Sequence, residues 1–246
     1  MKEWFENWFD SPYYHLLYRN RDHQEAERFV DRIMQQFPMQ PDQCLLDLAC
    51  GKGRHALAFS KYGMDVTGLD LSPESIAAAN EFAHEKLHFF VHDMRHLFRA
   101  NYFDRVVNLF TSFGYFRSPH DNEKAAQSMA IAVKPGGQVL IDFINREPAL
   151  LHIQAHRHES IERDDIQFSI ERSFENHQFV KQIHVTDHEK TFHFEERVNS
   201  FSLADMLTLF EHAGLQHTLS FGNYQLEPYN PQTSPRMILV FTKPHV

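Results

Sequence analysis

An apolar run that ends in a glycine-rich turn, Leu45 to Arg54, constrains the fold more than any other feature of this chain. A second apolar run, Met64 to Leu69, follows after a helix-length segment and ends in Asp70, seventeen residues past Gly53. Two short apolar strands joined by a helix are typical of parallel sheets, which need a crossover between neighbouring strands. The segment therefore predicts a parallel β-α-β unit.

The same alternation continues from about residue 43 to residue 146. Helix starts are marked by Ser72-Pro73 and Ser118-Pro119, and the turn Lys134 to Gly137 ends a helix before another strand. A helix at 203–213 and two more strands close the chain. The pattern predicts an α/β fold, a doubly wound, mostly parallel seven-stranded sheet. Its expected strands are the run from Leu45, then 64–69, 87–91, 103–110, 138–143, 215–224 and 236–243.

The turn and Asp70 together predict a nucleoside site. Gly51 and Gly53 let the backbone lie against a ligand where a side chain would clash. A carboxylate at the tip of the neighbouring strand can accept hydrogen bonds from both hydroxyls of a ribose. These residues alone do not identify the nucleoside that is bound.

Two additions flank the expected core, which comprises residues 41–148 and 200–246. Residues 1–40 are rich in aromatic side chains and are expected to form a helical lid. Residues 149–199 alternate apolar and polar side chains with period two in three stretches, which predicts a three-stranded antiparallel meander. Its apolar face must pack on the core, cover a ligand or contact a second copy of the chain. A monomer and a homodimer both remain open.

Charge and composition narrow the class of partner. The formal charge of −9 argues against a nucleic-acid-binding surface, because phosphate binding relies on Lys and Arg. No apolar run approaches a membrane span, and acidic residues interrupt the N-terminus where a signal peptide would be apolar. We therefore expect a cytoplasmic protein with a small-molecule substrate and no membrane or nucleic-acid partner.

Several motifs in order resemble the class I S-adenosylmethionine-dependent methyltransferase family over residues 43–145. Asp47 to Gly53 is similar to its first motif, Leu69 to Ser72 to its ribose-binding motif, and His92 to Met94 to its adenine-flanking loop. Asn108 to Tyr115 and Lys134 to Gly137 are similar to its fourth strand and the turn before its fifth. The aromatic N-terminus and the meander resemble a bacterial subgroup presumed to act on small molecules.

The resemblance implies that the cofactor is S-adenosylmethionine and that S-adenosylhomocysteine is the product. It implies an acidic residue, Asp47, that holds the methionine amino group through the turn and water. Free N–H groups at the helix start after Gly53 can bind the carboxylate. The implied cofactor-binding residues are Tyr14, Tyr18, Asp47, Ala49, Gly51, Gly53, Arg54, Asp70, Leu71, Asp93, Met94, Phe110 and Thr111. Tyr14 and Tyr18 equally fit a packing role.

Two alternatives to a methyltransferase remain at this point. Gly51, Gly53 and Ala56 satisfy the GxGxxA pattern of NAD(P)-binding Rossmann oxidoreductases, and Asp70 lies near the spacing expected there. The same core could also bind S-adenosylmethionine or its product without catalysis, as a sensor or an assembly subunit. Asp47 inside the strand and Asp93 after the third strand favour the methyltransferase.

The expected reaction is in-line transfer of a methyl group to an oxygen or nitrogen of a small molecule. Because the methyl group is already activated, the site mainly positions a nucleophile and excludes water. Four residues are candidates for binding or deprotonating the acceptor: His193 and, as alternatives, Tyr115, Tyr224 and Arg236. His193 qualifies only if the polar face of the meander looks into the pocket, since such faces are usually solvated. Arg236 could bind a carboxylate through two hydrogen bonds.

The 18 histidines do not predict a metal site. His152, His156 and His158 come closest to a ligand spacing, but no HExxH motif accompanies them. The segment Asn108 to Thr111 also lacks the Pro-Pro-Tyr sequence typical of methylation at adenine or glutamine amino groups. We expect no metal, and the identity of the acceptor stays open.

Overall fold

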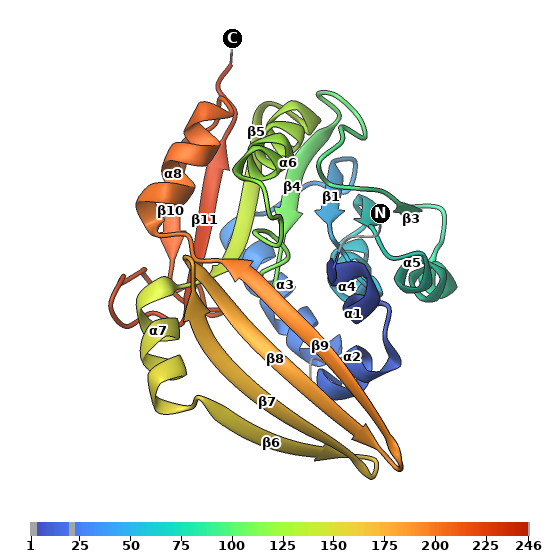
Figure 1. The fold of residues 1–246 in the computed structure, drawn as a ribbon. Coiled ribbons are helices and arrows are strands. Elements are labelled where there is room, and N and C mark those ends of the chain that lie inside the picture. Colours follow the sequence, from blue (N-terminus) through green and yellow to red (C-terminus); the bar gives the residue numbers. More distant parts are fainter. Residues whose placement is uncertain (1–3, 20–22, 246) are drawn as a thin grey trace.

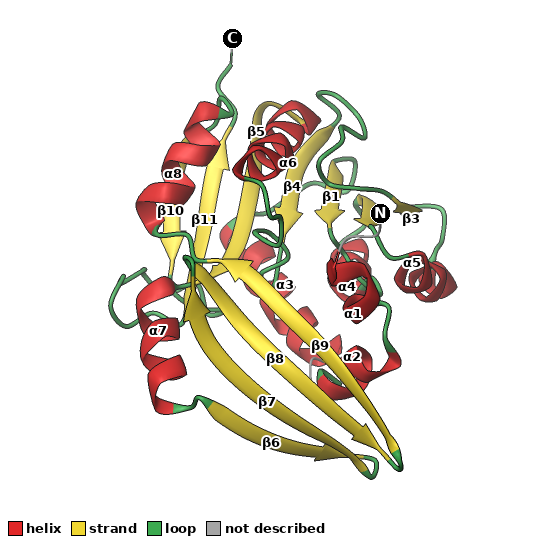
Figure 2. Ribbon diagram, viewed as in Figure 1, coloured by secondary structure: helices red, strands yellow, loops and turns green. Residues whose placement is uncertain are grey.

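The computed structural model describes residues 4–19 and 23–245, which form two β-sheets and the helices around them (Figures 1 and 2). The helices are α1 (Trp4–Phe9), α2 (Pro12–Leu17), α3 (His23–Gln36), α4 (Arg54–Ser60), α5 (Pro73–Ala79), the 3-10 helix η1 (Asn80–Phe82), α6 (Pro119–Ala132), α7 (Arg146–Ala155) and α8 (Leu203–His212). The strands are β1 (Cys44–Leu48), β2 (Asp65–Asp70), β3 (Leu87–Val91), β4 (Phe103–Asn108), β5 (Val133–Ile144), β6 (His158–Arg163), β7 (Ile166–Glu175), β8 (Gln178–Asp187), β9 (Lys190–Asn199), β10 (Gln216–Phe221) and β11 (Arg236–Thr242).

The larger sheet has seven strands in the order β10-β11-β5-β4-β1-β2-β3. Strands β1 to β5 run parallel, whereas β11 pairs antiparallel with β5 and β10 pairs antiparallel with β11. The chain order reverses at β1, which lies between β2 and β4. Ligands of such sheets bind outside the carboxyl ends of the strands at this reversal.

Helices cover both faces of this sheet, which confirms the doubly wound fold. On one face, α3 and α4 pack through Phe29, Ile33 and Phe59 against the apolar side chains of the strands. On the other face, α6 and α8 do the same through Met129 and Phe210. The central strands of the seven-stranded sheet are thus buried on both faces, which explains their continuous apolar sequences.

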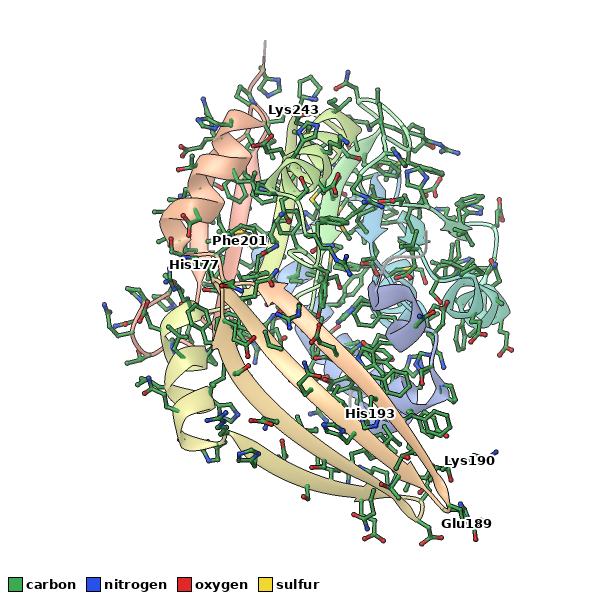
Figure 3. All side chains as sticks on the ribbon, viewed as in Figure 1. His177, Glu189, Lys190, His193, Phe201 and Lys243 are labelled. Carbon is green, nitrogen blue, oxygen red and sulfur yellow. The ribbon has the colours of Figure 1, made fainter. Side chains whose placement is uncertain are left out.

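The second sheet is antiparallel and has four strands in the order β6-β7-β8-β9. The prediction of three strands was therefore wrong. It missed β6, an edge strand with mostly exposed side chains and no apolar alternation. The turns that join β7 to β8 and β8 to β9 contain Asn176, His177 and His188, which have positive φ. Figure 3 shows Glu189 and Lys190 at the free end of the β8–β9 hairpin, with His177 and Phe201 near the core.

Helices α1 and α2 pack on the inner face of the second sheet. Trp8 is 1% exposed and belongs, with Leu17, to a cluster that includes Phe168, Ile183 and Val185. The aromatic N-terminus is therefore covered mainly by the sheet at 158–199. Figure 1 shows α1 and α2 beside β9.

Other features of residues 4–19 and 23–245 bear on the class of protein. No helix there combines the length and apolar character needed to cross a membrane. No three His, Cys, Asp or Glu side chains of this part gather as a metal site would require. Cys44 and Cys50 are free thiols.

Candidate functional site

The turn between β1 and α4 has a backbone that few side chains tolerate. Ala49, Gly51 and Gly53 have φ values of 62°, 55° and 80°. A Cβ at Gly53 would lie 2.7 Å from two ring carbons of Phe89, so only glycine fits there. At Gly51 a Cβ would meet no atom within 4 Å, which leaves open space beside the turn.

Asp70 at the end of β2 holds this turn. Its Oδ2 accepts a hydrogen bond from the Gly51 N–H at 2.8 Å, and its Oδ1 accepts one from the Ser72 N–H at 2.9 Å. Burial raises the pKa of Asp70, and these two hydrogen bonds oppose the rise. The carboxylate is thereby fixed in orientation before any ligand binds.

Asp47 lies beneath the turn and is 2% exposed. Within the described residues its Oδ2 has no hydrogen-bond partner. Burial, followed by repulsion from Asp70, raises the pKa of Asp47 to about 7. A buried carboxyl without a full set of partners is costly, which makes Asp47 a fitting partner for a cationic group of a ligand.

The loop after β3 contributes a second acidic residue. The Asp93 carboxylate binds the Arg95 guanidinium, with Oδ2 and Nη2 2.6 Å apart. Burial raises the pKa of Asp93, but the hydrogen bonds and charge of Arg95 lower it more, so the net pKa is lowered. Asp93, Met94 and Leu71 all line one cavity, at the carboxyl ends of β2 and β3.

Residues that follow β4 have an unusual backbone held by a buried carboxylate. Phe110 and Thr111 have φ values of 67° and 58°, rare for such side chains. Asp142 on β5 is fully buried, and its Oδ2 accepts the Phe110 N–H at 2.8 Å. Arg236 on β11 donates from Nε to Asp142 Oδ1 at 2.8 Å and from Nη2 to Thr111 Oγ1 at 2.7 Å. Tyr224 donates its hydroxyl to the same carboxylate at 3.2 Å.

Arg236 carries a permanent positive charge in this network. Burial lowers its pKa, but the charge and hydrogen bond of Asp142 together with Tyr224 and Tyr115 raise it more, so the net pKa is raised. The Arg54 guanidinium lies 4.5 Å from the ring centroid of Phe110, and its Nη1 is 3.0 Å from Glu25. Phe110 is thus held by the network on its backbone and by Arg54 on its ring.

A cavity of about 1260 Å³ connects these groups. It exceeds the roughly 300–1,000 Å³ that encloses one drug-sized ligand, so it has room for two molecules. One half is lined by the turn after β1 and the ends of β2 and β3. The other half is lined by the ends of β4, β5 and β11, by α7 and by the inner face of β7–β9.

The cavity brings together most of the predicted residues. Those on its wall are Tyr14, Tyr18, Ala49, Gly51, Arg54, Asp70, Leu71, Asp93, Met94, Phe110, Thr111, Tyr115 and Arg236. Asp47 and Gly53 lie behind the turn instead. Tyr14 and Tyr18 reach the wall from α2 and its end, and their rings contact each other at 5.0 Å between centroids.

His193 does not reach the cavity. Phe192 and Phe194 face the N-terminal helices, so the period of two turns the intervening His193 to the outer face. There it is exposed, and its Nδ1 lies 2.5 Å from Nδ1 of His184 on β8 (Figure 3). The condition on which His193 was a candidate, an inward polar face, is not met.

The second sheet contributes three charged residues to the cavity wall that were not predicted as site residues: Arg172, Lys181 and Glu196. A signal was present in the sequence. Each interrupts the apolar alternation of one strand of the meander, between Ile170 and Phe174 in the first case. A charge at a position where the pattern requires an apolar side chain indicates a role other than packing.

Comparison with known proteins adds to this geometry. The family described as "Methyltransferase domain" matches residues 45–137. The dTDP-3-amino-3,4,6-trideoxy-alpha-D-glucopyranose N,N-dimethyltransferase of Streptomyces venezuelae is 33% identical over 133 residues, which are 52% of this chain and 54% of that protein. The chain thus matches about half the length of this curated relative.

Solved structures share the fold over nearly the whole chain. An S-adenosylmethionine-dependent methyltransferase from Clostridium acetobutylicum has a TM-score of 0.78 and 20% identity, covering 97% of this chain and 99% of that one. Streptomyces venezuelae DesVI has a TM-score of 0.69 and 24% identity, covering 94% and 96%. Both identities are below 25%, so these two structures show that the fold is shared. The methyltransferase-domain match over residues 45–137 and the 33%-identical relative favour a methyltransferase over the NAD(P)-binding alternative, and with the shared fold they make the chain similar to S-adenosylmethionine-dependent methyltransferases.

Proposed function

We propose that this protein transfers the methyl group of S-adenosylmethionine to a nitrogen or oxygen of a small-molecule acceptor. The cavity of about 1260 Å³ carries the proposal, because it joins the glycine-rich turn and Asp70 to a second half with room for an acceptor. A binding protein that only sensed the nucleoside would need the first half alone.

The residues of the first half fit the cofactor. Asp70 would accept the ribose hydroxyls with the lone pairs that Gly51 and Ser72 leave free. Ala49, Gly51, Gly53 and Arg54 at the turn would hold the methionine portion, in the open space beside Gly51. The unpartnered Oδ2 of Asp47 would balance the positive amino group. Leu71, Asp93 and Met94 would surround adenine.

The second half would hold the acceptor. When bound, the sulfonium supplies a methyl group already activated for attack. Phe110 and Thr111 would border that group, since they leave β4 at the reversal of strand order. Arg236 stays protonated and would donate hydrogen bonds to an acceptor oxygen, and it cannot act as a base. Tyr115 would orient the nucleophile from the same wall.

His152 on α7 is a better candidate for the base than His193. It lines the cavity, whereas His193 faces outward. Burial lowers the pKa of His152, and the neighbouring His156 and Arg172 lower it further, so the ring is neutral near pH 7. A neutral imidazole can accept the proton that the attacking nitrogen or oxygen must lose.

The three parts of the chain would have distinct tasks. Residues 41–148 and 200–246 would hold the cofactor, residues 149–199 would shape the acceptor half, and residues 1–40 would act as the lid. The contacts of Tyr14 and Tyr18 with the cavity and with the inner face of the second sheet support this division.

An amino sugar is the first acceptor class to test, because the 33%-identical relative is named as an amino-sugar N,N-dimethyltransferase. The experiment incubates the protein with methyl-labelled S-adenosylmethionine and a panel of amino sugars, each paired with its hydroxyl analogue. Transfer to an amine but not to its analogue would support a nitrogen nucleophile. Binding of the cofactor without transfer to any acceptor of either kind would favour the sensor alternative.

The matched variants for this experiment come from one strand. Asp70→Ala should abolish transfer, since the ribose contacts are lost. Asp65→Ala removes the carboxylate at the opposite end of β2, away from the cavity wall, and should leave transfer intact. Equal loss in both variants would show that the effect arises from the strand and not from the site.

A further inference from the structure

A row of charged side chains crosses the otherwise apolar inner face of the second sheet. On this face Phe168, Ile170, Ile183 and Val185 pack against the N-terminal helices. Closer to the core on the same face lies the row itself, in which Arg172, Lys181 and Glu196 are aligned across β7, β8 and β9. Glu159 of β6, which pairs with Ile170, adds a fourth charge by binding Arg172. Beyond it the face is apolar again, with Phe179 and Val198 paired across β8 and β9.

The strand register places the two cations of the row directly opposite each other. Arg172 on β7 pairs with Lys181 on β8, and Lys181 in turn pairs with Glu196 on β9. Each cation binds one carboxylate. Arg172 donates from Nη2 to Glu159, and Nζ of Lys181 lies 3.1 Å from Oε2 of Glu196. Like charges directly opposite across strands are destabilising, so the centre of the row is electrostatically unfavourable.

Glu196, at one end of the row, also has partners outside the row. Oε1 of Glu196 accepts hydrogen bonds from Trp8 Nε1 at 2.7 Å and from the Tyr18 hydroxyl at 2.8 Å. Burial raises the pKa of Glu196, but Lys181 and these hydrogen bonds lower it more, so it remains charged. Glu159 is not part of the cavity wall, whereas Arg172 and Lys181 are.

The two cations retain donors for a ligand. The side-chain hydrogen bonds of Arg172 use Nη1, to the His156 carbonyl, and Nη2, to Glu159. Lys181 uses two of its three N–H groups, for Tyr18 and Glu196. An oxyanion between Arg172 and Lys181 would accept the remaining donors and remove their mutual repulsion.

We propose that Arg172 and Lys181 bind an oxyanion group of the methyl acceptor, a phosphate or a carboxylate. This inference rests on the proposed methyl transfer and names the class of its acceptor. The overall charge of −9 would repel such an acceptor, and a pair of cations inside the cavity counteracts that repulsion. The neighbouring His152 lies on the same wall, so the anion would be held beside the candidate base.

The test titrates the S-adenosylhomocysteine-loaded protein with inorganic pyrophosphate and, separately, with malonate, by calorimetry at low salt. We expect saturable binding of at least one probe, weakened about tenfold or more by Arg172→Gln and by Lys181→Gln. Tighter binding of pyrophosphate would identify a phosphate-bearing acceptor, and tighter binding of malonate a carboxylate-bearing one. Absence of saturable binding of both probes would overturn the proposal.

The control variant is Arg197→Gln, which removes a cation from the outer face of the same sheet. It should leave probe binding unchanged, and equal weakening by all three variants would mean that general charge, not this pair, binds the probe. Lys181→Arg keeps the charge and should restore most of the affinity. Retained binding of S-adenosylhomocysteine shows that each variant is folded.

The two proposals fail in different ways. If the wild-type protein does not bind S-adenosylhomocysteine, the proposed methyl transfer is refuted. If it binds S-adenosylhomocysteine but neither pyrophosphate nor malonate, only the proposed acceptor class is refuted. Once an acceptor is known, Lys181→Gln should raise its KM with little change in kcat, because Lys181 binds the group that does not react.

Discussion

At the residue scale, the buried carboxyl of Asp47 should make cofactor affinity depend on pH. Its pKa of about 7 in the free protein means that it is protonated below pH 7. A positive amino group of the ligand favours the charged carboxylate, so binding must displace this proton in acid. S-adenosylhomocysteine should therefore bind up to about tenfold more weakly for each pH unit below 7, and with constant affinity above it.

Calorimetry at several pH values and in buffers of different ionisation enthalpy measures both the affinity and the released proton. Asp47→Asn should bind more weakly at pH 8 and lose the pH dependence. An affinity that stays constant from pH 5.5 to pH 8 in the wild type would contradict this role of Asp47.

Asp142 should be the most costly single carboxylate to neutralise. Asp142→Asn leaves the Arg236 guanidinium buried without its counter-charge, a change that costs about 3–5 kcal/mol in comparable buried pairs. Lys134→Gln breaks a partly exposed pair with Asp104 and should cost about 0–1 kcal/mol. Urea unfolding of both variants measures the difference, and equal losses would mean that the network around Phe110 does not depend on this charge pair.

At the element scale, local sequence signals explain which parts of the fold could be predicted. The strand at 87–91 was placed with its observed bounds, and Ser72 caps α5 through its hydroxyl as Ser72-Pro73 predicts. Each of these signals consists of only a few consecutive residues. Strand β6 has no such local signal, because it forms through pairing with β7 and only its Ile161 joins the apolar cluster.

Strand β2 packs so closely against β3 that one added methyl group should disturb it. A Cβ at Gly68 would lie 2.5 Å from Cδ1 of Phe89 and 2.9 Å from Sγ of Cys50. Gly68→Ala should therefore destabilise the protein by about 1–3 kcal/mol. Adding Phe89→Leu should recover part of this loss, measured as coupling in a double-mutant cycle. Strict additivity of the two changes would show that Phe89 is not the obstacle.

The N-terminal helices should loosen when one hydrogen bond to the second sheet is removed. Trp8→Phe keeps a ring but loses the 2.7 Å bond to the buried Glu196, worth about 1.5–3 kcal/mol. Amide exchange in α1 and α2 should rise about tenfold or more, with β1–β5 unchanged. Tyr13→Phe removes a bond to Asp187 at the sheet's free end and should have a smaller effect. The reverse order would contradict an anchoring role for Glu196.

At the scale of the whole molecule, the two halves of the cavity differ in how far the sequence reveals them. The half proposed for the cofactor is built from strand ends and turns, so Gly51, Asp70 and Asp93 follow from motifs in the sequence. The acceptor half arises where α7, β7–β9 and β11 meet. The pairing of Arg172 with Lys181 depends on strand register, and the outward direction of His193 depends on which face meets the lid.

The most direct test of the account is calorimetric titration of the purified protein with S-adenosylhomocysteine and, separately, with NAD and NADP. The account predicts saturable binding of S-adenosylhomocysteine alone, weakened about a hundredfold or more in Asp70→Ala and unchanged in Asp65→Ala. Binding of a dinucleotide in its place, or equal S-adenosylhomocysteine affinity in Asp70→Ala and the wild type, would contradict it.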